Sequence, residues 1–336
     1  MNVKINREEI QFNDIEGIRI GQCQDAEAMT GVSVVIFDVE NAGGIDISGG
    51  GPASRETHLL SPYTDTKSIN ALVLSGGSVF GLSASDGVLN YLENKKIGYQ
   101  LGSQVIPLVV QSSIFDLTIG DSNIRPDAKM GYQACVDAEN NVIPKSGSFG
   151  AGTGATVGKL LGMNRSQKSG IGYIAFKIGE IKIGAMVVVN AVGDILNYRT
   201  GEQVAGLVNN NRTRFMRTDE QFYNELPTGA NTTLAAIFTN CKFSEAEMNK
   251  IAAMARSGLS RSISPVNTMA DGDTIYAFSV GNEKADINVV GSLAANILSE
   301  AILKAISTSQ CPDEIYLKSI ITVSYTHLTL PTTERV

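Results

Sequence analysis

The chain of 336 residues is predicted to fold as one domain that mixes β-sheet with α-helix. Hydrophobic residues make up 43% of it and charged residues 18%, which is a globular composition with ample material for a core. Short apolar runs of strand length are interspersed with segments whose apolar residues keep helical spacing. No obvious linker or internal repeat divides the chain.

The expected elements follow from these patterns in chain order. Apolar runs bounded by turn residues predict strands around 18–20 and at 32–37, 69–74, 105–110, 171–177, 183–190, 234–239 and 274–278. Helical spacing predicts helices at 83–95, 127–139 and 292–306. A further helix should begin after Ser244, because Ser244 and Glu247 form a capping-box pattern. Glycines are dense between 43 and 52, where a turn is expected.

Charge and cysteine content restrict the class of protein. A net charge of −7 does not fit a protein that binds nucleic acid or an anionic membrane surface. The N-terminal residues lack the apolar core of a signal peptide, and no apolar run reaches the roughly 18 residues of a transmembrane helix. We therefore expect a cytoplasmic protein with reduced, scattered thiols at Cys23, Cys135, Cys241 and Cys311.

Histidine is scarce, and this limits the available chemistry. Only His58 and His327 are present, so a Ser-His-Asp or Cys-His mechanism would depend on His58. A zinc site built on imidazole is similarly short of ligands, and no metal or other cofactor is expected. If the chain is a hydrolase, its general base is not expected to be histidine.

The glycine-rich segment 147–158 does not match either common nucleotide motif. The Walker pattern requires Gly where Thr153 stands and Ser or Thr where Leu160 stands. The dinucleotide fingerprint requires a third Gly where Val157 stands. A glycine-rich turn with exposed amides remains open as an interpretation.

The most informative stretch is Gly229-Ala230-Asn231-Thr232-Thr233-Leu234, where a polar segment meets a predicted buried strand. The hydroxyl of Thr232 can attack the carbonyl of Asn231, and hydrolysis of the resulting ester leaves Thr232 as a new N-terminus. Its α-amine, with an unperturbed pKa of about 8, can then serve as general base for its own hydroxyl. The alternative is that Thr232 and Thr233 are ordinary β-branched strand residues after a turn.

Other polar positions could support such chemistry. Asn190 ends a predicted strand, where its amide could donate to an oxyanion or simply cap a turn. Gly77 and Ser78 lie in a strand–glycine turn–helix connection whose backbone N–H groups could bind an anion or a carbonyl oxygen. Asp271 and Asp273 form an acidic turn, but two carboxylates are a thin case for a metal site.

Taken in order, these segments resemble the DmpA-type family of self-processing hydrolases, which includes L-aminopeptidase/D-esterases and β-peptidyl aminopeptidases. The resemblance extends over about residues 12–308. It rests on several long motifs in the same order along the chain, at residues 50–57, 74–88, 114–117, 150–159, 189–194, 231–234 and 271–274.

The resemblance implies an αββα sandwich, in which two packed sheets lie between outer helices as in N-terminal-nucleophile hydrolases with a different connectivity. It implies one domain over residues 1–323 that is cleaved before Thr232, giving associated chains of about 1–231 and 232 onward. Thr232 would be the nucleophile, Asn231 the residue before the cut, and Asn190 the oxyanion donor. Thr268 and Asp271 are the expected groups that orient the amine of the nucleophile.

The same resemblance suggests where and on what the enzyme acts. Gly77, Ser78 and Asp116 are the expected substrate contacts, with Asp116 as a candidate anchor for a substrate ammonium. His58 stands where an acidic residue is expected after Arg-Glu-Thr. The implied substrates are small peptides or amides, and the implied assembly is a homo-oligomer of cleaved two-chain protomers.

Two other hypotheses stay open at this point. The chain could be an acyltransferase of the ornithine-acetyltransferase type, which resembles this fold and also exposes a Thr, although its junction normally lacks the preceding Asn. It could also be an uncleaved relative with a binding or structural role. Residues 324–336, which include His327, resemble translated sequencing-adapter sequence and are treated as a non-native tail.

Overall fold

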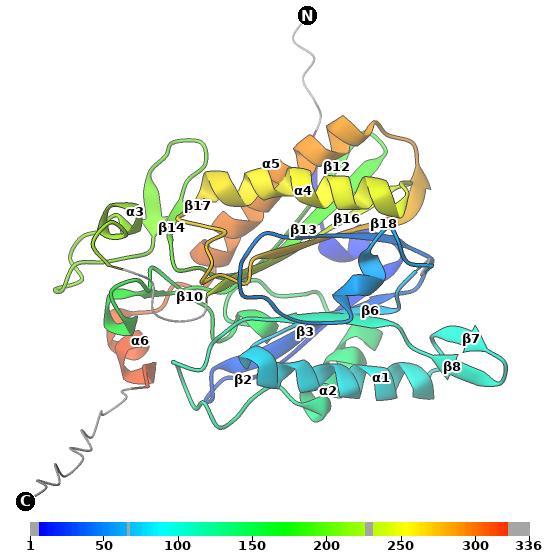
Figure 1. Ribbon diagram of the computed structural model, residues 1–336, viewed down its shortest axis with the longest axis horizontal. Helices are drawn as coiled ribbons and strands as arrows, with labels where there is room; N and C mark the ends of the chain where they lie inside the picture. Colours follow the sequence, from blue (N-terminus) through cyan, green and yellow to red (C-terminus); the bar gives the residue numbers. More distant parts are fainter. Residues whose placement is uncertain (1–6, 66–67, 226–230, 322–336) are drawn as a thin grey trace, which may run out of the picture.

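Two β-sheets stack face to face, and a pair of helices covers the outer face of each (Figure 1). The computed structural model describes residues 7–65, 68–225 and 231–321. The upper sheet in Figure 1 has six strands in the order β1-β12-β13-β16-β18-β4, and the lower sheet has five in the order β2-β3-β6-β9-β5. This is the αββα arrangement, and the predicted fold class is confirmed.

The six-stranded sheet consists of β1 (Arg7–Ile10), β12 (Ile171–Ile178), β13 (Ile181–Asn190), β16 (Thr232–Cys241), β18 (Thr274–Glu283) and β4 (Ala42–Ile47). The five-stranded sheet consists of β2 (Ile18–Asp25), β3 (Thr30–Phe37), β6 (Ala71–Ser75), β9 (Val109–Ser113) and β5 (Ala53–Arg55). Pairing is antiparallel in both sheets except between β16 and β18 and between β6 and β9.

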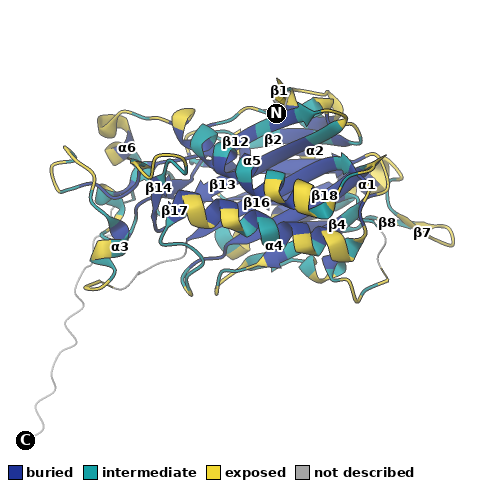
Figure 2. Cartoon of the chain, turned by 90° about the horizontal axis from the view of Figure 1, so that it is seen from above, coloured by how far each residue is buried: buried dark blue, intermediate teal, exposed yellow. Residues whose placement is uncertain are grey.

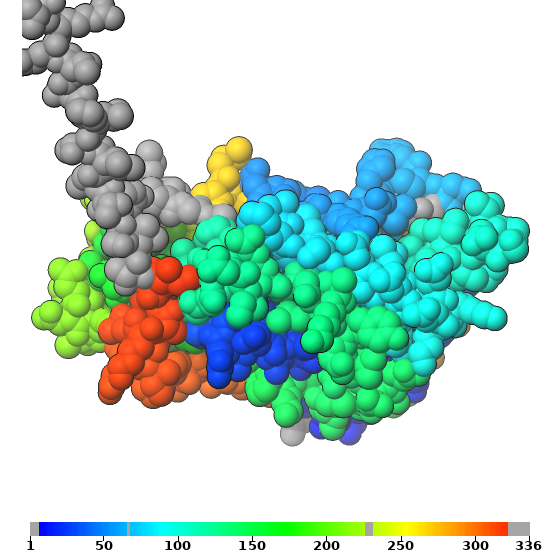
Figure 3. All heavy atoms as spheres, turned by 90° about the horizontal axis from the view of Figure 1, so that it is seen from below, coloured from blue at the N-terminus to red at the C-terminus, as the bar shows by residue number. Residues whose placement is uncertain are grey.

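The helices lie outside the sheets. The six-stranded sheet is covered by α4 (Glu245–Ser262) and α5 (Ile287–Ser307), and the five-stranded sheet by α1 (Ala84–Asn94) and α2 (Ala128–Glu139). Seen from above, the outward faces of α4 and α5 are intermediate or exposed (teal and yellow), and the strands beneath them are buried (dark blue) (Figure 2). Seen from below, cyan and green parts of the sequence, which include α1 and α2, form much of the surface (Figure 3).

Smaller elements complete the chain. They are the hairpin β7 (Tyr99–Leu101) and β8 (Gln104–Ile106), the pair β10 (Thr156–Val157) and β11 (Gln167–Lys168), and the strands β14 (Asp194–Leu196), β15 (Gln203–Ala205) and β17 (Ile263–Ser264). The short helices are α3 (Thr218–Gln221), α6 (Asp313–Ser319), η1 (Phe12–Asp14), η2 (Thr57–Leu60), η3 (Ser78–Ser83), η4 (Gly150–Gly152) and η5 (Met163–Arg165).

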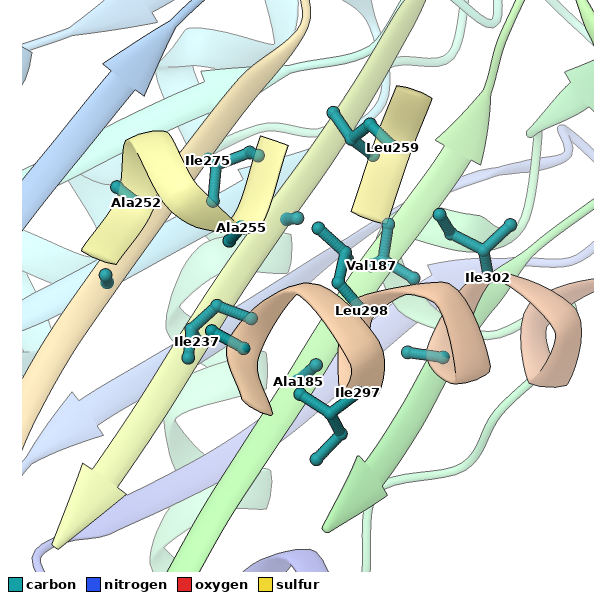
Figure 4. Close-up of a cluster of buried hydrophobic side chains, with 14 of the residues drawn as sticks. Ala185, Val187, Ile237, Ala252, Ala255, Leu259, Ile275, Ile297, Leu298 and Ile302 are labelled. Carbon is teal, nitrogen blue, oxygen red and sulfur yellow. The ribbon is translucent and has the colours of Figure 1, made fainter. Parts of the chain in front are cut away.

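The central strand β16 shows why its sequence is a continuous apolar run. Leu234 and Phe238 point between the two sheets, whereas Ala235 and Ile237 point toward α4 and α5. Side chains alternate faces along a strand, and here both faces are buried. Figure 4 shows the outer layer, where Ile237 of β16 lies with side chains of β13, β18, α4 and α5.

Three expectations about elements were wrong in detail. The predicted strand at 105–110 is divided between β8 and β9, since Pro107 lies between them and has no N–H to give to a ladder. The glycines Gly43 and Gly44 lie in β4 rather than in a turn. A Cβ at Gly44 would lie 2.1 Å from the backbone nitrogen of Asn249, so α4 packs too closely for any other residue. Finally, α5 begins at Ile287, where Asp286 caps it.

By length and composition α5 could cross a membrane, but it serves as a core helix in this fold. Its residues Ala294, Leu298 and Ile302 are fully buried. They belong to the apolar layer between the six-stranded sheet and the helices that cover it.

Removal of residues 324–336, which lie outside the described part of the chain, is expected to leave the protein soluble and active. The unfolding temperature should change by less than about 2 °C, because the sequence of the tail has no core-facing pattern. Truncation after Gln310 is the matched control. It also removes α6, whose Tyr316 is buried and whose Asp313 pairs with Arg212, and it should lower the unfolding temperature clearly. An insoluble or inactive protein after the shorter truncation would contradict the assignment of this tail.

Candidate active site

Two predicted site residues meet at the ends of adjacent central strands. Thr232 is the first residue of β16 and Asn190 the last residue of β13, and the antiparallel register pairs them directly. Thr232 is 4% exposed and Asn190 fully buried. Residues Gly229 and Ala230, which precede the junction, lie outside the described residues, but Asn231 is placed.

The carbonyl oxygen of Asn231 is held by two donors. The hydroxyl of Thr232 donates to it at 2.5 Å, and the backbone N–H of Gly272 donates to it at 2.7 Å. The N–H of Asn231 in turn donates to the carbonyl of Ala270 at 3.0 Å. These bonds form a parallel bridge between Asn231 and Asp271 that lies just beyond the β16–β18 pairing. The peptide bond between Asn231 and Thr232 is therefore fixed against the acidic turn.

The acidic turn is a network of two buried carboxylates. The hydroxyl of Thr268 donates to Oδ2 of Asp271 at 2.6 Å. The carboxylate of Asp273 accepts from the backbone N–H of Thr233 at 2.5 Å and from that of Asn267 at 2.9 Å. Burial raises the pKa of Asp271, and burial together with the Asp271 carboxylate raises the pKa of Asp273 to about 7.

A lysine completes the charged cluster. Nζ of Lys159 donates to the backbone carbonyl of Asn190 at 2.8 Å and to its side-chain Oδ1 at 2.9 Å. Burial lowers the pKa of Lys159 to about 7, against the attraction of Asp271, Asp116 and Asp273, which favours the charged form. A lysine and a carboxyl group that both titrate near neutral pH can exchange protons with a reacting group, which is typical of catalytic sites.

The side chain of Asn190 is held in one orientation. Its Oδ1 accepts from Lys159 and from the backbone N–H of Thr156 at 3.1 Å. Its Nδ2 donates to the carbonyl of Phe115 at 2.9 Å. An amide group has two N–H donors, and within the described part of the chain only one of them has an acceptor, so the other can serve a further acceptor.

The predicted substrate contacts, Gly77, Ser78 and Asp116, form hydrogen bonds with other groups of the protein. The N–H of Gly77 donates to Oδ1 of Asp116 at 2.7 Å, and the N–H of Ser78 donates to the carbonyl of Ile114 at 2.8 Å. Oδ2 of Asp116 accepts from the hydroxyl of Thr30 at 2.8 Å, and Asp116 is 3% exposed. Because these donors and acceptors already have partners within the protein, they stabilise the turn at Gly77 and Ser78. The geometry does not support direct contacts between these groups and a substrate.

The sequence did not predict a role for Lys159, Gly272 or Asp273. Lys159 closes the glycine-rich motif at 150–159, but its burial depends on a fold that brings it to the end of β13. For Asp273 the sequence indicated only a weakly supported metal ligand. Among the described residues, no group of three or more His, Cys, Asp or Glu side chains is placed to hold a metal ion.

A second buried lysine anchors the glycine-rich segment. Nζ of Lys168 donates to the carbonyls of Gly152, Ala155 and Ser169, and burial lowers its pKa to about 7. Below about pH 7 the lysine is protonated in both the folded and the unfolded chain. Between about pH 7 and 10.5 only the unfolded chain holds the proton, so the free energy of unfolding should rise with pH, by at most about 5 kcal/mol.

Lys168→Met is expected to flatten this rise. Chemical denaturation at pH 7, 8.5 and 10 measures the slope, and Lys242→Met, at an exposed position, is the control that should keep it. Equal slopes in wild-type and Lys168→Met protein would contradict the assignment of a buried lysine that is neutral in the folded state.

The stacked sheets between helices form a fold like that of the N-terminal-nucleophile hydrolases, with an acid–base cluster at the ends of the central strands. A family model described as peptidase family S58 matches residues 11–313. The chain belongs to this family. It is therefore an enzyme of the aminopeptidase and amidohydrolase type.

Curated relatives cover most of the chain. An uncharacterized aminopeptidase of Mycobacterium tuberculosis is 34% identical over 332 residues, which cover 89% of this chain and 94% of the relative. A 6-aminohexanoate-oligomer endohydrolase of Agromyces sp. is 30% identical over 319 residues, covering 89% of this chain and 86% of that enzyme.

Solved structures show the same fold at low sequence identity. The L-aminopeptidase D-Ala-esterase/amidase of Ochrobactrum anthropi, described as a new variant of the Ntn hydrolase fold, superposes with a TM-score of 0.69 at 17% identity and covers 89% of this chain and 86% of its own. A β-aminopeptidase of Burkholderia sp. superposes with a TM-score of 0.66, also at 17% identity, and covers 92% of each chain.

Proposed function

We propose that the chain cleaves itself between Asn231 and Thr232 and then uses the freed threonine as the nucleophile of an amidohydrolase. The observation that carries this proposal is the position of the Thr232 hydroxyl, 2.5 Å from the carbonyl oxygen of Asn231. That carbonyl is also polarised by the Gly272 N–H. A hydroxyl beside a polarised carbonyl is arranged for an N-to-O acyl shift.

In turnover, each polar group of the site has a part. The α-amine of Thr232 removes the proton of its own hydroxyl, which attacks the substrate carbonyl. Asp271, held by Thr268, orients this amine. The free N–H of Asn190 stabilises the oxyanion, and Lys159 exchanges protons with the leaving group and with the attacking water.

The substrate class that fits best is an amide without a free amine next to the cleaved bond. Asp116 is 3% exposed and bonded within the protein, so it does not offer a carboxylate to a substrate ammonium. The Agromyces relative is named as an endohydrolase of 6-aminohexanoate oligomers. We therefore infer that this enzyme cuts internal amide bonds of short linear amides.

Intact mass spectrometry of the purified protein is the first test. Wild-type protein should contain two chains, the smaller beginning at Thr232, and native size-exclusion chromatography with light scattering should show that they stay associated. A protein that stays intact after prolonged incubation would remove the self-cleavage hypothesis.

Product analysis tests the reaction. N-acetylated short linear amides should be hydrolysed faster than amino-acid p-nitroanilides with a free α-amine. Transfer of the acyl group to an added amine in preference to water would instead support an acyltransferase. A cleaved protein without activity on either class would favour a non-catalytic role.

A further inference from the structure

The carbonyl oxygen of Asn231 already has a backbone donor, and that donor does not belong to Asn190. The backbone N–H of Gly272 donates to the carbonyl oxygen of Asn231 at 2.7 Å. The side-chain amide of Asn190 instead donates to the carbonyl of Phe115. The scissile bond and the predicted oxyanion residue therefore do not share a hydrogen bond in the intact chain.

A segment from the N-terminal part of the chain, residues 48–51, holds the turn that contains Gly272. We call this segment the strap. The N–H groups of Ser48 and Gly49 donate to the carbonyl of Asp273 at 3.0 and 3.1 Å. The N–H of Gly50 donates to the carbonyl of Thr268 at 3.1 Å. The N–H of Gly51 donates to the carbonyl of Asp271 at 2.8 Å. Four successive amides thus hold the acidic turn on both sides of Gly272.

The space around the strap requires glycine at position 49 but not at position 51. A Cβ at Gly49 would lie 2.4 Å from the carbonyl oxygen of Asp271 and from the backbone nitrogen of Asp273. A Cβ at Gly51 would lie 3.8 Å from its nearest neighbours, which is ordinary contact. Neither glycine has a positive φ, so only close approach distinguishes the two positions.

We propose that the Gly272 N–H is the oxyanion donor of the self-cleavage step, that the strap positions it, and that Asn190 serves only the later turnover. This inference rests on the self-cleavage proposed above. The Thr232 hydroxyl oxygen forms a covalent bond to the carbonyl carbon of Asn231. Negative charge then develops on the Asn231 carbonyl oxygen, which accepts the hydrogen bond from the Gly272 N–H. The bond from this carbon to the Thr232 nitrogen then breaks, and the hydroxyl proton ends on that nitrogen. Water hydrolyses the ester to the Asn231 carboxylate and the Thr232 hydroxyl.

The donor is tested by removing the N–H of Gly272 from the backbone. Cell-free translation with glycolic acid in place of Gly272 converts the peptide bond after Asp271 into an ester. This change deletes the N–H, and it also weakens the Asp271 carbonyl as an acceptor for the Gly51 N–H. Loss of one oxyanion donor typically costs about 10²–10³ in rate, and the cleavage rate in a pulse–chase should fall by this factor. Glycolic acid in place of Gly179, where nothing lies within 4 Å of an added Cβ, is the matched control and should cleave normally.

The separate roles of the Gly272 N–H in self-cleavage and of Asn190 in turnover can be tested by a second measurement. Once cleaved, the protein with glycolic acid at 272 should keep a kcat per cleaved protomer within about threefold of wild type, since one lost donor would cost far more. Asn190→Ala should show the reverse pattern, with nearly normal cleavage and a low kcat. Normal cleavage with glycolic acid at 272 would overturn the proposed donor, whereas wild-type protein that never cleaves would instead overturn the proposed function.

The strap is tested with Gly49→Ala and Gly51→Ala. A displacement of about 1 Å can cost roughly 10²-fold in a positioned reaction, so Gly49→Ala should slow cleavage by about 10–100-fold while Gly51→Ala stays close to wild type. Combining Gly49→Ala with glycolic acid at 272 should slow cleavage less than the product of the two effects, because both act on the same N–H. Normal cleavage in Gly49→Ala, or fully multiplicative effects, would remove the strap from the proposal.

Discussion

Thr232→Val is expected to abolish both self-cleavage and hydrolysis while leaving the fold intact. Valine keeps the β-branched shape of threonine at the start of β16 and removes only the hydroxyl that contacts Asn231. Without a nucleophile there is no acyl shift, and without the shift there is no free α-amine to act as base. Mass spectrometry should show one full-length chain, and the hydrolysis rate should fall by at least about 10⁴-fold.

Thr233→Val is the matched control for this change. Thr233 is the next residue of β16 and its side chain lies on the opposite face, because side chains alternate along a strand. This variant should be cleaved and active. Thr232→Ser should also be cleaved, since it keeps a hydroxyl at the same position. Cleaved or active Thr232→Val protein would assign the nucleophile to another residue.

The architecture was predictable because its strands and helices carry strong local patterns. The run that begins at Leu234 is apolar on both faces, as a strand buried between a second sheet and two helices must be. Ser244 and Glu247 form the predicted capping box at the start of α4. The order of motifs then supported a family resemblance, and the family match over residues 11–313 confirms it.

Where local pattern and packing disagree, packing decides. Gly43 and Gly44 are poor strand formers, yet they lie in β4 opposite β18. The close approach of α4 to Gly44 is a tertiary fact that no local pattern encodes. The same holds for the strap, whose glycines were expected to serve a turn and instead pack against the backbone of the acidic turn.

The candidate site was predictable only in part, for a similar reason. Thr232 and Asn190 could be proposed because each stands at the end of a strand, and the register of β13 and β16 pairs them. Lys159 could not, because a lysine in a glycine-rich segment is usually solvated, and only the fold buries it against Asn190. Gly272 contributes a backbone N–H, which every residue type except proline has, so no side chain marks its role.

Asn190→Ala is expected to lower kcat by about 10²–10³ and to change KM little. During attack by Thr232, negative charge develops on the substrate oxygen, and a fixed N–H in a buried site stabilises that charge more than it stabilises the neutral carbonyl. The fraction of cleaved protein is measured first by mass spectrometry, so that kcat refers to cleaved protomers. Steady-state kinetics on an amide substrate then gives kcat and KM.

Asn190→Asp distinguishes two roles of Asn190, donation of an N–H to the oxyanion and acceptance of the hydrogen bond from Lys159. Aspartate keeps an oxygen that can accept from Lys159 and from the N–H of Thr156, but it replaces the amide donor with a group that repels the developing charge. It should therefore be at least as damaging as alanine. If aspartate retains activity and only alanine loses it, Asn190 acts through Lys159.

If the cleaved alanine variant keeps a nearly normal kcat, the donor must lie elsewhere. The amides of Gly77 and Ser78 are bonded within the protein. The Gly272 N–H, released when the Asn231 carbonyl departs, would then serve both steps.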